Sequence, residues 1–160
     1  MRKRDGREGH SALRRGRVSL PQHVYHVTTV TAGRSPVFES FPAARVVARC
    51  LNAPGLLRDA RTLCWVLMPD HLHWLVQLGE SQDLSTLVRR LKSSSALEIN
   101  RQAATSRLAL WSSSFYDRAL RQEEDLETAA RYIIGNPVRD GLVESVGDYP
   151  HWDAAWDWDL

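Results

Sequence analysis

Two histidines, His71 and His73, lie one residue apart in the apolar stretch CWVLMPDHLHWLV, which covers residues 64–76. Side chains alternate between the two faces of a β-strand, so both imidazoles are expected on the same face. Two imidazoles at this spacing can bind one metal ion, each through one ring nitrogen. A histidine pair on the solvated face of a strand is the other interpretation, and the spacing alone does not separate the two.

A second candidate group lies near the C-terminus, in the stretch RYIIGNPVRDGLV. Tyr132 and Asn136 are four residues apart, so on a helix they share one face. Asn136 could give its amide oxygen to a metal while Tyr132 presents a phenol beside it. The same spacing also fits a core aromatic on an apolar helix stripe, followed by a helix-end residue before Pro137.

The apolar patterning predicts the elements that would position these residues. Strands are expected at 23–31, 61–69, 71–78 and 110–120, and helices at 41–53, 83–105 and 123–134. The order is β-α-β-β-α-β followed by an additional C-terminal helix that carries Tyr132. This order predicts an α+β fold of the ferredoxin-like, split βαβ type, with an antiparallel sheet and its first two helices on one face.

The length and composition predict one domain over residues 21–160, preceded by a basic arm over residues 1–20. The arm carries seven Lys or Arg against two acids, which suits phosphate contacts or a solvated tail. The two cysteines are far apart, which argues against a disulfide framework or a zinc finger and fits a reducing cytoplasm. No apolar run approaches the roughly 20 residues of a membrane span, and no export signal is seen.

Five blocks of the sequence together resemble the REP-associated tyrosine transposases, from about His23 to Trp152. These transposases belong to the HUH superfamily of single-strand nucleases, named after a His-U-His motif in which U is any hydrophobic residue. The blocks are YHVTTVTAGRSPVF, WVLMPDHLHWLVQL, LVRRLKSSSALEIN, LWSSSFYDRALR and ARYIIGNPVRDGLV.

The resemblance implies a role for each candidate residue. His71 and His73 match the metal motif, Tyr132 matches the nucleophile, and Asn136 matches the third ligand, where related insertion-sequence transposases have Gln. The implied cofactor is Mg²⁺ or Mn²⁺, and a His/His/Asn set suits Mn²⁺ on ligand softness. The implied reaction is cleavage of single-stranded DNA next to a REP-type hairpin, through a 5′-phosphotyrosine intermediate.

Further residues are candidates for DNA binding, most of them on the polar face of the helix 83–105. They are Arg89, Arg90, Lys92, Arg101, Tyr116 and Arg139. Asp70 is interpreted as a turn residue, with an outer carboxylate next to the metal as the alternative, and His26 as structural.

The expected protein is a cytoplasmic monomer, although related insertion-sequence enzymes share tyrosine and metal across a dimer. Two other functions remain open. One is a nucleic-acid-binding module without cleavage, and the other is a metal phosphohydrolase that uses water instead of Tyr132.

Overall fold

The computed structural model describes residues 19–104, 109–121 and 124–158, so the expected basic arm lies outside the described residues apart from its last two. Five strands form one antiparallel sheet in the order β4-β1-β3-β2-β5. Their bounds are β1 Val24–Val30, β2 Arg61–Met68, β3 His71–Gln77, β4 Tyr116–Ala119 and β5 Trp152–Ala154. The first four strands have the order expected for a split βαβ fold.

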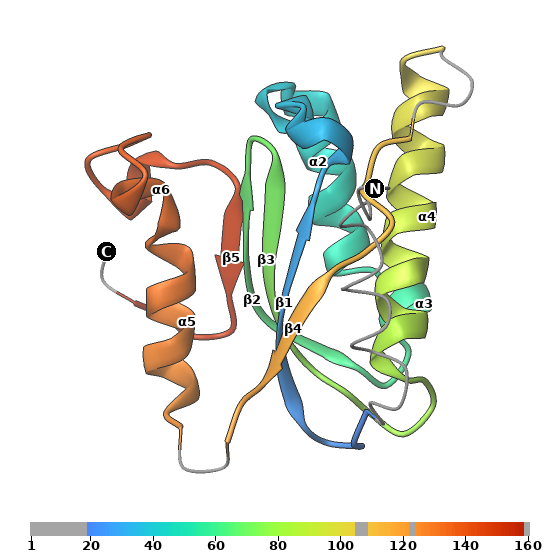
Figure 1. Ribbon diagram of the computed structural model, residues 1–160. Helices are drawn as coiled ribbons and strands as arrows, with labels where there is room; N and C mark the ends of the chain where they lie inside the picture. Colours follow the sequence, from blue (N-terminus) through green and yellow to red (C-terminus); the bar gives the residue numbers. More distant parts are fainter. Residues whose placement is uncertain (1–18, 105–108, 122–123, 159–160) are drawn as a thin grey trace, which may run out of the picture.

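Two long helices cover one face of this sheet, as the element order predicted (Figure 1). Helix α2, Phe41–Leu51, connects β1 to β2, and helix α4, Leu84–Gln102, connects β3 to β4. Each helix is preceded by a residue whose side chain accepts a hydrogen bond from the first turn. Ser40 accepts from the Ala43 N–H, and Asp83 accepts from the Thr86 N–H at 2.7 Å. The α+β, ferredoxin-like prediction is therefore confirmed.

The opposite face of the sheet carries helix α5, Leu126–Ile134, which begins after the capping Asp125. Its apolar residues Ala130, Ile133 and Ile134 pack on Val66 and Leu75 in a second core. The helix predicted over 123–134 begins later, at Leu126, and ends at Ile134 as predicted, and Asn136 then begins a separate helix α6, Asn136–Arg139. Pro137 has no N–H to donate to the Ile133 carbonyl four residues earlier, and that carbonyl accepts from the Asn136 side chain instead.

Two other differences concern the strands. Only Tyr116–Ala119 of the predicted strand 110–120 is a strand, and Trp111 forms an isolated bridge to Thr31. The intervening serines lie in a loop whose carbonyls accept from Lys92. Strand β5 was not predicted, because three residues with an aspartate at the centre give no strand pattern.

The remaining elements are short. They are the helix α3, Pro54–Leu57, and three 3₁₀ turns, Ala32–Arg34, Val37–Glu39 and Val146–Asp148. None of the helices in the described part of the chain combines the length and the apolar character needed to cross a membrane.

Candidate active site

The register of β1 and β3 brings polar side chains together on the face that carries α5. Thr28 lies opposite His73, and Val30 lies opposite His71. Residues directly opposite in an antiparallel pair share a face, so His26 and Thr28 of β1 lie on the same side as both histidines of β3. The ring centres of His71 and His73 are 4.9 Å apart.

His73 is fixed through its Nδ1 atom. This nitrogen lies 3.0 Å from Nε2 of His26 and 3.2 Å from Oγ1 of Thr28. The contacts occupy Nδ1, so a metal would bind His73 through Nε2. The sequence pattern indicated a structural role for His26 and gave no role to Thr28, although their spacing of two along β1 was a signal that both face one side.

His71 is fixed by a carboxylate. Its Nδ1 atom lies 2.6 Å from Oδ1 of Asp70, so an Nδ1–H donates to the carboxylate and Nε2 keeps the lone pair that a metal requires. Oδ2 of Asp70 also lies 3.5 Å from Nη1 of Arg34. The geometry therefore favours the alternative interpretation of Asp70, an outer carboxylate that orients a metal ligand.

The titration of these groups suits metal binding. Burial lowers the pKa of His73 to about 3, helped by the positive charges of His71, His26 and Arg139. Burial and the charge of Arg118 lower the pKa of His26 to about 4. Both rings are therefore neutral near pH 7, which is the form that binds a metal.

Asp70 carries the complementary negative charge. Burial pulls the pKa of Asp70 upward, but the hydrogen bond from His71 and the charges of His71 and Arg34 outweigh it, so this pKa lies below its ordinary value. The carboxylate is thus ionised near neutral pH and accepts the Nδ1–H of His71.

Tyr132 lies on α5 with 67% of its surface exposed, so it is not a core aromatic. It lines a hollow of about 420 Å³ together with His26, the residue that contacts His73. The guanidinium carbon of Arg139 lies 3.9 Å from the centre of the Tyr132 ring. The same charge helps to lower the pKa of His73, so one guanidinium acts on both the phenol ring and one of the two histidines.

Asn136 lies at the start of α6, where its amide nitrogen donates to the Ile133 carbonyl at 2.7 Å. This bond uses the nitrogen and not the oxygen, which is the atom that would bind a metal. Within the described residues, no group of three or more His, Cys, Asp and Glu side chains could hold a metal ion. Two imidazoles with their Nδ1 atoms engaged fit a metal as a pair of donors through Nε2, and the role of Asn136 as the third stays a prediction.

The DNA-binding candidates on α4 lie on the face opposite the histidine pair. Two of them bind within the fold: Arg90 donates to the Gln82 side chain and the Gly55 carbonyl, and Lys92 to the carbonyls of Ser112 and Ser114. Arg101 pairs with Glu98 on the same helix, and Arg89 is exposed. A DNA contact by these four residues stays a prediction, and the structure does not bring them to the site.

Tyr116 and Arg139, by contrast, lie on the same face of the sheet as the histidine pair. Tyr116 pairs with Thr28 in the register of β4 and β1, and 51% of its surface is exposed. It therefore shares a face with His26 and His73.

Comparison with known proteins identifies the family and the fold. Residues 19–136 match the family model described as "Transposase IS200 like". A REP-associated tyrosine transposase of Escherichia coli is 33% identical over 96 residues, covering 57% of this chain and 54% of that protein. A Haemophilus influenzae protein that carries the same name provisionally is 31% identical over 99 residues, 56% of each chain. The chain thus spans about half the length of the curated relatives it matches.

A solved structure, that of a REP-associated tyrosine transposase bound to a REP hairpin, has the same fold. It superimposes with a TM-score of 0.69 at 22% identity, over 85% of this chain and 79% of that one. The chain belongs to the IS200-like transposase family, and within it resembles the REP-associated tyrosine transposases, as the five sequence blocks predicted.

Proposed function

We propose that this chain is a metal-dependent endonuclease of the transposase type, which cleaves single-stranded DNA next to a hairpin through Tyr132. The observation that carries the proposal is that Tyr132, which lies under Arg139, lines one hollow with His26, the residue that contacts His73 of the histidine pair. The solved relative is bound to a REP hairpin, and we extend this substrate class, a REP-type palindrome, to the present chain. The proposed place of action is the cytoplasm.

The reaction is a transesterification at one phosphorus atom. The Tyr132 oxygen forms a bond to phosphorus, the bond from phosphorus to the 3′ oxygen breaks, and the phenolic proton is balanced by the proton gained by the leaving 3′-hydroxyl. A phenol with its reference pKa near 10 is ionised in only about one molecule in a thousand at pH 7, a penalty of about 4 kcal/mol. Positioning of the ring and the charge of the site must offset this penalty.

The residues of the site share that task. Arg139 holds the Tyr132 ring by lying over it and by donating to the Tyr132 carbonyl at 2.5 Å. Asp70 and the pair His26 and Thr28 fix the two metal-binding imidazoles. His71, His73 and Asn136 would hold a Mg²⁺ or Mn²⁺ ion, which would withdraw charge from the oxygens of the scissile phosphate.

The test is covalent trapping with hairpin oligonucleotides that carry a single-stranded flank, in the presence of Mn²⁺. A 5′-phosphotyrosine retains the fragment 3′ to the cut, so the protein should acquire label from 3′-labelled DNA and not from 5′-labelled DNA. Tyr132→Phe should abolish the adduct. Tyr116→Phe is the matched control, because Tyr116 is also exposed on this face, and it should keep the adduct.

The outcomes also separate the rival functions. Equal adduct in Tyr132→Phe and in the unaltered chain would refute the role of Tyr132. Cleavage without any adduct, retained in Tyr132→Phe, would indicate a hydrolase that uses water. Hairpin binding without metal-dependent cleavage would indicate a binding module.

A further inference from the structure

Helix α5 leaves part of its face of the sheet uncovered. It packs mainly on β2, β3 and β5, at one side of the sheet, whereas β4 is the edge strand on the other side (Figure 1). On β4, Tyr116 lies opposite Thr28 and Arg118 lies opposite His26, so both point to the same face as the histidine pair. Tyr116 and Arg118 are both exposed there.

The result is a trough with β1 and β4 as its floor and α5 as its wall. We call it the β4 trough, and define it by all the residues that line it: His26, Arg118, Leu120, Glu124, Asp125, Thr128, Ala129, Tyr132 and Ile133. Its volume is about 420 Å³, and the three aliphatic residues make its interior largely apolar. Tyr132 lies in its wall, and His26, which contacts His73, lies in its floor.

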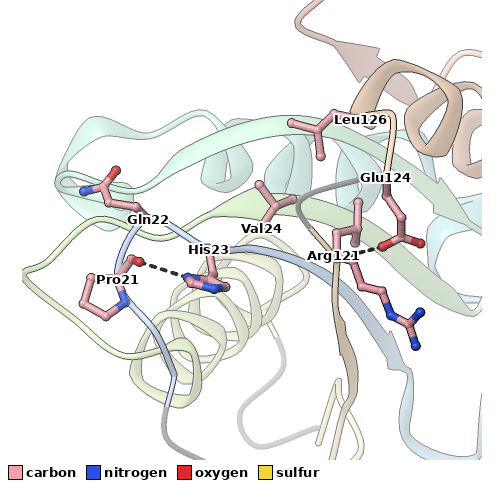
Figure 2. A pocket seen from close by; sticks show the side chains of 8 residues that line it. Pro21, Gln22, His23, Val24, Arg121, Glu124 and Leu126 are labelled. Atoms are coloured by element: carbon pink, nitrogen blue, oxygen red, sulfur yellow. Dashed lines mark hydrogen bonds between the residues drawn. The ribbon is translucent and has the colours of Figure 1, made fainter.

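The trough continues beyond Leu120 into a second hollow of about 210 Å³. Leu120 and Glu124 line both hollows, so the two form one path. Figure 2 shows this far end, which Leu126 lines together with the segment from Pro21 to Val24 that enters β1, whereas the Glu124 carboxylate turns toward Arg121. An elongated path therefore runs from the candidate nucleophile to the start of β1.

We infer that the β4 trough binds the single-stranded DNA that flanks the scissile phosphate, with a base stacked on Tyr116 and a phosphate bound by Arg118. The inference rests on the proposed function. A largely apolar hollow with a cation in its lining and an exposed aromatic ring beside it, on the same face of β4, matches how proteins bind single strands, where bases stack on side chains and cations follow the backbone. The path also begins at Tyr132, where such a strand must pass.

Arg118 is held by an acidic side chain in the structure without DNA. Its Nη1 atom lies 2.7 Å from Oε1 of Glu124, whose other oxygen accepts from the Arg121 N–H at 2.7 Å. The Arg118 side chain is 58% exposed and that of Glu124 35% exposed. An exposed ion pair of this kind is weak, so a DNA phosphate can replace the carboxylate. Glu124 therefore competes with DNA for Arg118.

The test measures the binding of two hairpins, with and without a single-stranded flank, to the Tyr132→Phe protein in EDTA. Arg118→Ala should weaken binding of the flanked hairpin about tenfold and reduce the salt slope by about 0.7, the value for one phosphate of a single strand. Tyr116→Ala should weaken it about five- to hundredfold, and Tyr116→Phe should not. The hairpin without a flank should bind these variants equally well.

Glu124→Gln gives the sharper test, because it should tighten binding of the flanked hairpin only while Arg118 is present. Glu98→Gln is the matched control, since Glu98 pairs with Arg101 at the same distance of 2.7 Å on the opposite face of the sheet. Equal tightening by both variants would show a general charge effect and overturn the inference. Tightening by Glu124→Gln that persists in Arg118→Ala would overturn it as well.

Further results distinguish DNA binding in the trough from self-association of the chain and from a failure of the proposed nuclease. If β4 pairs with a second copy of the chain, Tyr116→Ala should change the sedimentation of the free protein, and the flank should have no effect. If the adduct forms normally but no trough variant alters binding, the trough inference fails and the proposed nuclease stands. If trough variants weaken binding but no adduct ever forms, the trough inference stands and the proposed nuclease fails.

Discussion

The guanidinium of Arg139 lies directly over the ring of Tyr132, with 3.9 Å between the guanidinium carbon and the ring centre. The room for this arrangement comes from Gly135. A Cβ atom at that position would lie 2.8 Å from Nη1 of Arg139, closer than such atoms approach. A missing side chain at the end of α5 thus admits the cation that holds the candidate nucleophile.

Gly135→Ala should therefore slow adduct formation without unfolding the protein. Loss of a cation–π contact costs about 0.5–2 kcal/mol, so we expect a rate lower by about two- to thirtyfold in single-turnover trapping. The free energy of unfolding should stay the same or rise, because Gly135 has helical dihedrals, φ −75° and ψ −4°, and alanine favours them. Gly55→Ala, at a site where a Cβ meets nothing within 4 Å, is the control. An unchanged trapping rate in Gly135→Ala would contradict the role of Arg139.

Asp70→Ala should weaken metal binding more than it weakens the fold. Removal of a carboxylate that orients a ligating imidazole typically costs 10- to 100-fold in metal affinity. Titration of Mn²⁺ followed by electron paramagnetic resonance measures this affinity without DNA. Asp140→Ala is the control, because Asp140 lines the same hollow as Asp70 and His71, whereas the carboxylate bonded to His71 is that of Asp70. Equal losses in both variants would indicate a general charge effect on the cation.

The arrangement of the histidines was largely predictable from the sequence. Strand alternation places His71 and His73 on one face, and the order of elements predicts that β1 is the neighbour of β3. The contact of His26 with His73 was not predictable, because it depends on the register of the pair, and a shift by one residue would turn His26 to the other face.

The roles of the charged residues on α4 were not predictable from the sequence. The spacing of Arg90 and Lys92 indicated a polar helix face, and polar faces look alike whether they bind DNA or the rest of the chain. Both side chains instead reach backbone carbonyls of segments far away in the sequence, at Gly55 and at the loop before β4. Such bonds depend on tertiary packing, which local spacing does not encode.

The histidines should make the metal-free protein sensitive to mild acid. Burial lowers the pKa of His73 to about 3 and that of His26 to about 4, whereas both titrate near 6.5 when unfolded. As the pH falls from 7 to 5, the unfolded chain takes up protons that the folded chain does not, so the free energy of unfolding decreases. We expect a decrease of about 2 kcal/mol for each imidazole, or about 4 kcal/mol for the two, in urea unfolding with EDTA. Above pH 7 this contribution should be constant.

A variant identifies the source of this sensitivity. His26→Gln should show a smaller decrease between pH 7 and pH 5, since one of the two low-pKa imidazoles is gone. Carboxylates do not complicate this window, because their unfolded pKa values near 4 lie below it. A decrease of the same size in His26→Gln and in the unaltered chain would refute the assignment to His26.

Tyr132 and the histidine pair of one chain should act together, without a partner subunit. In the structure the Arg139 guanidinium lies over the Tyr132 ring, and Tyr132 lines one hollow with His26, which contacts His73, so the candidate residues lie on one face of a single chain. A mixture of Tyr132→Phe with the double variant His71→Ala, His73→Ala should therefore form no adduct. An enzyme that shares tyrosine and metal across a dimer would regain about a quarter of its sites in an equal mixture, because half of the dimers are mixed and each holds one intact site. Recovery of adduct in the mixture, with a dimer seen by sedimentation, would contradict the expected monomer.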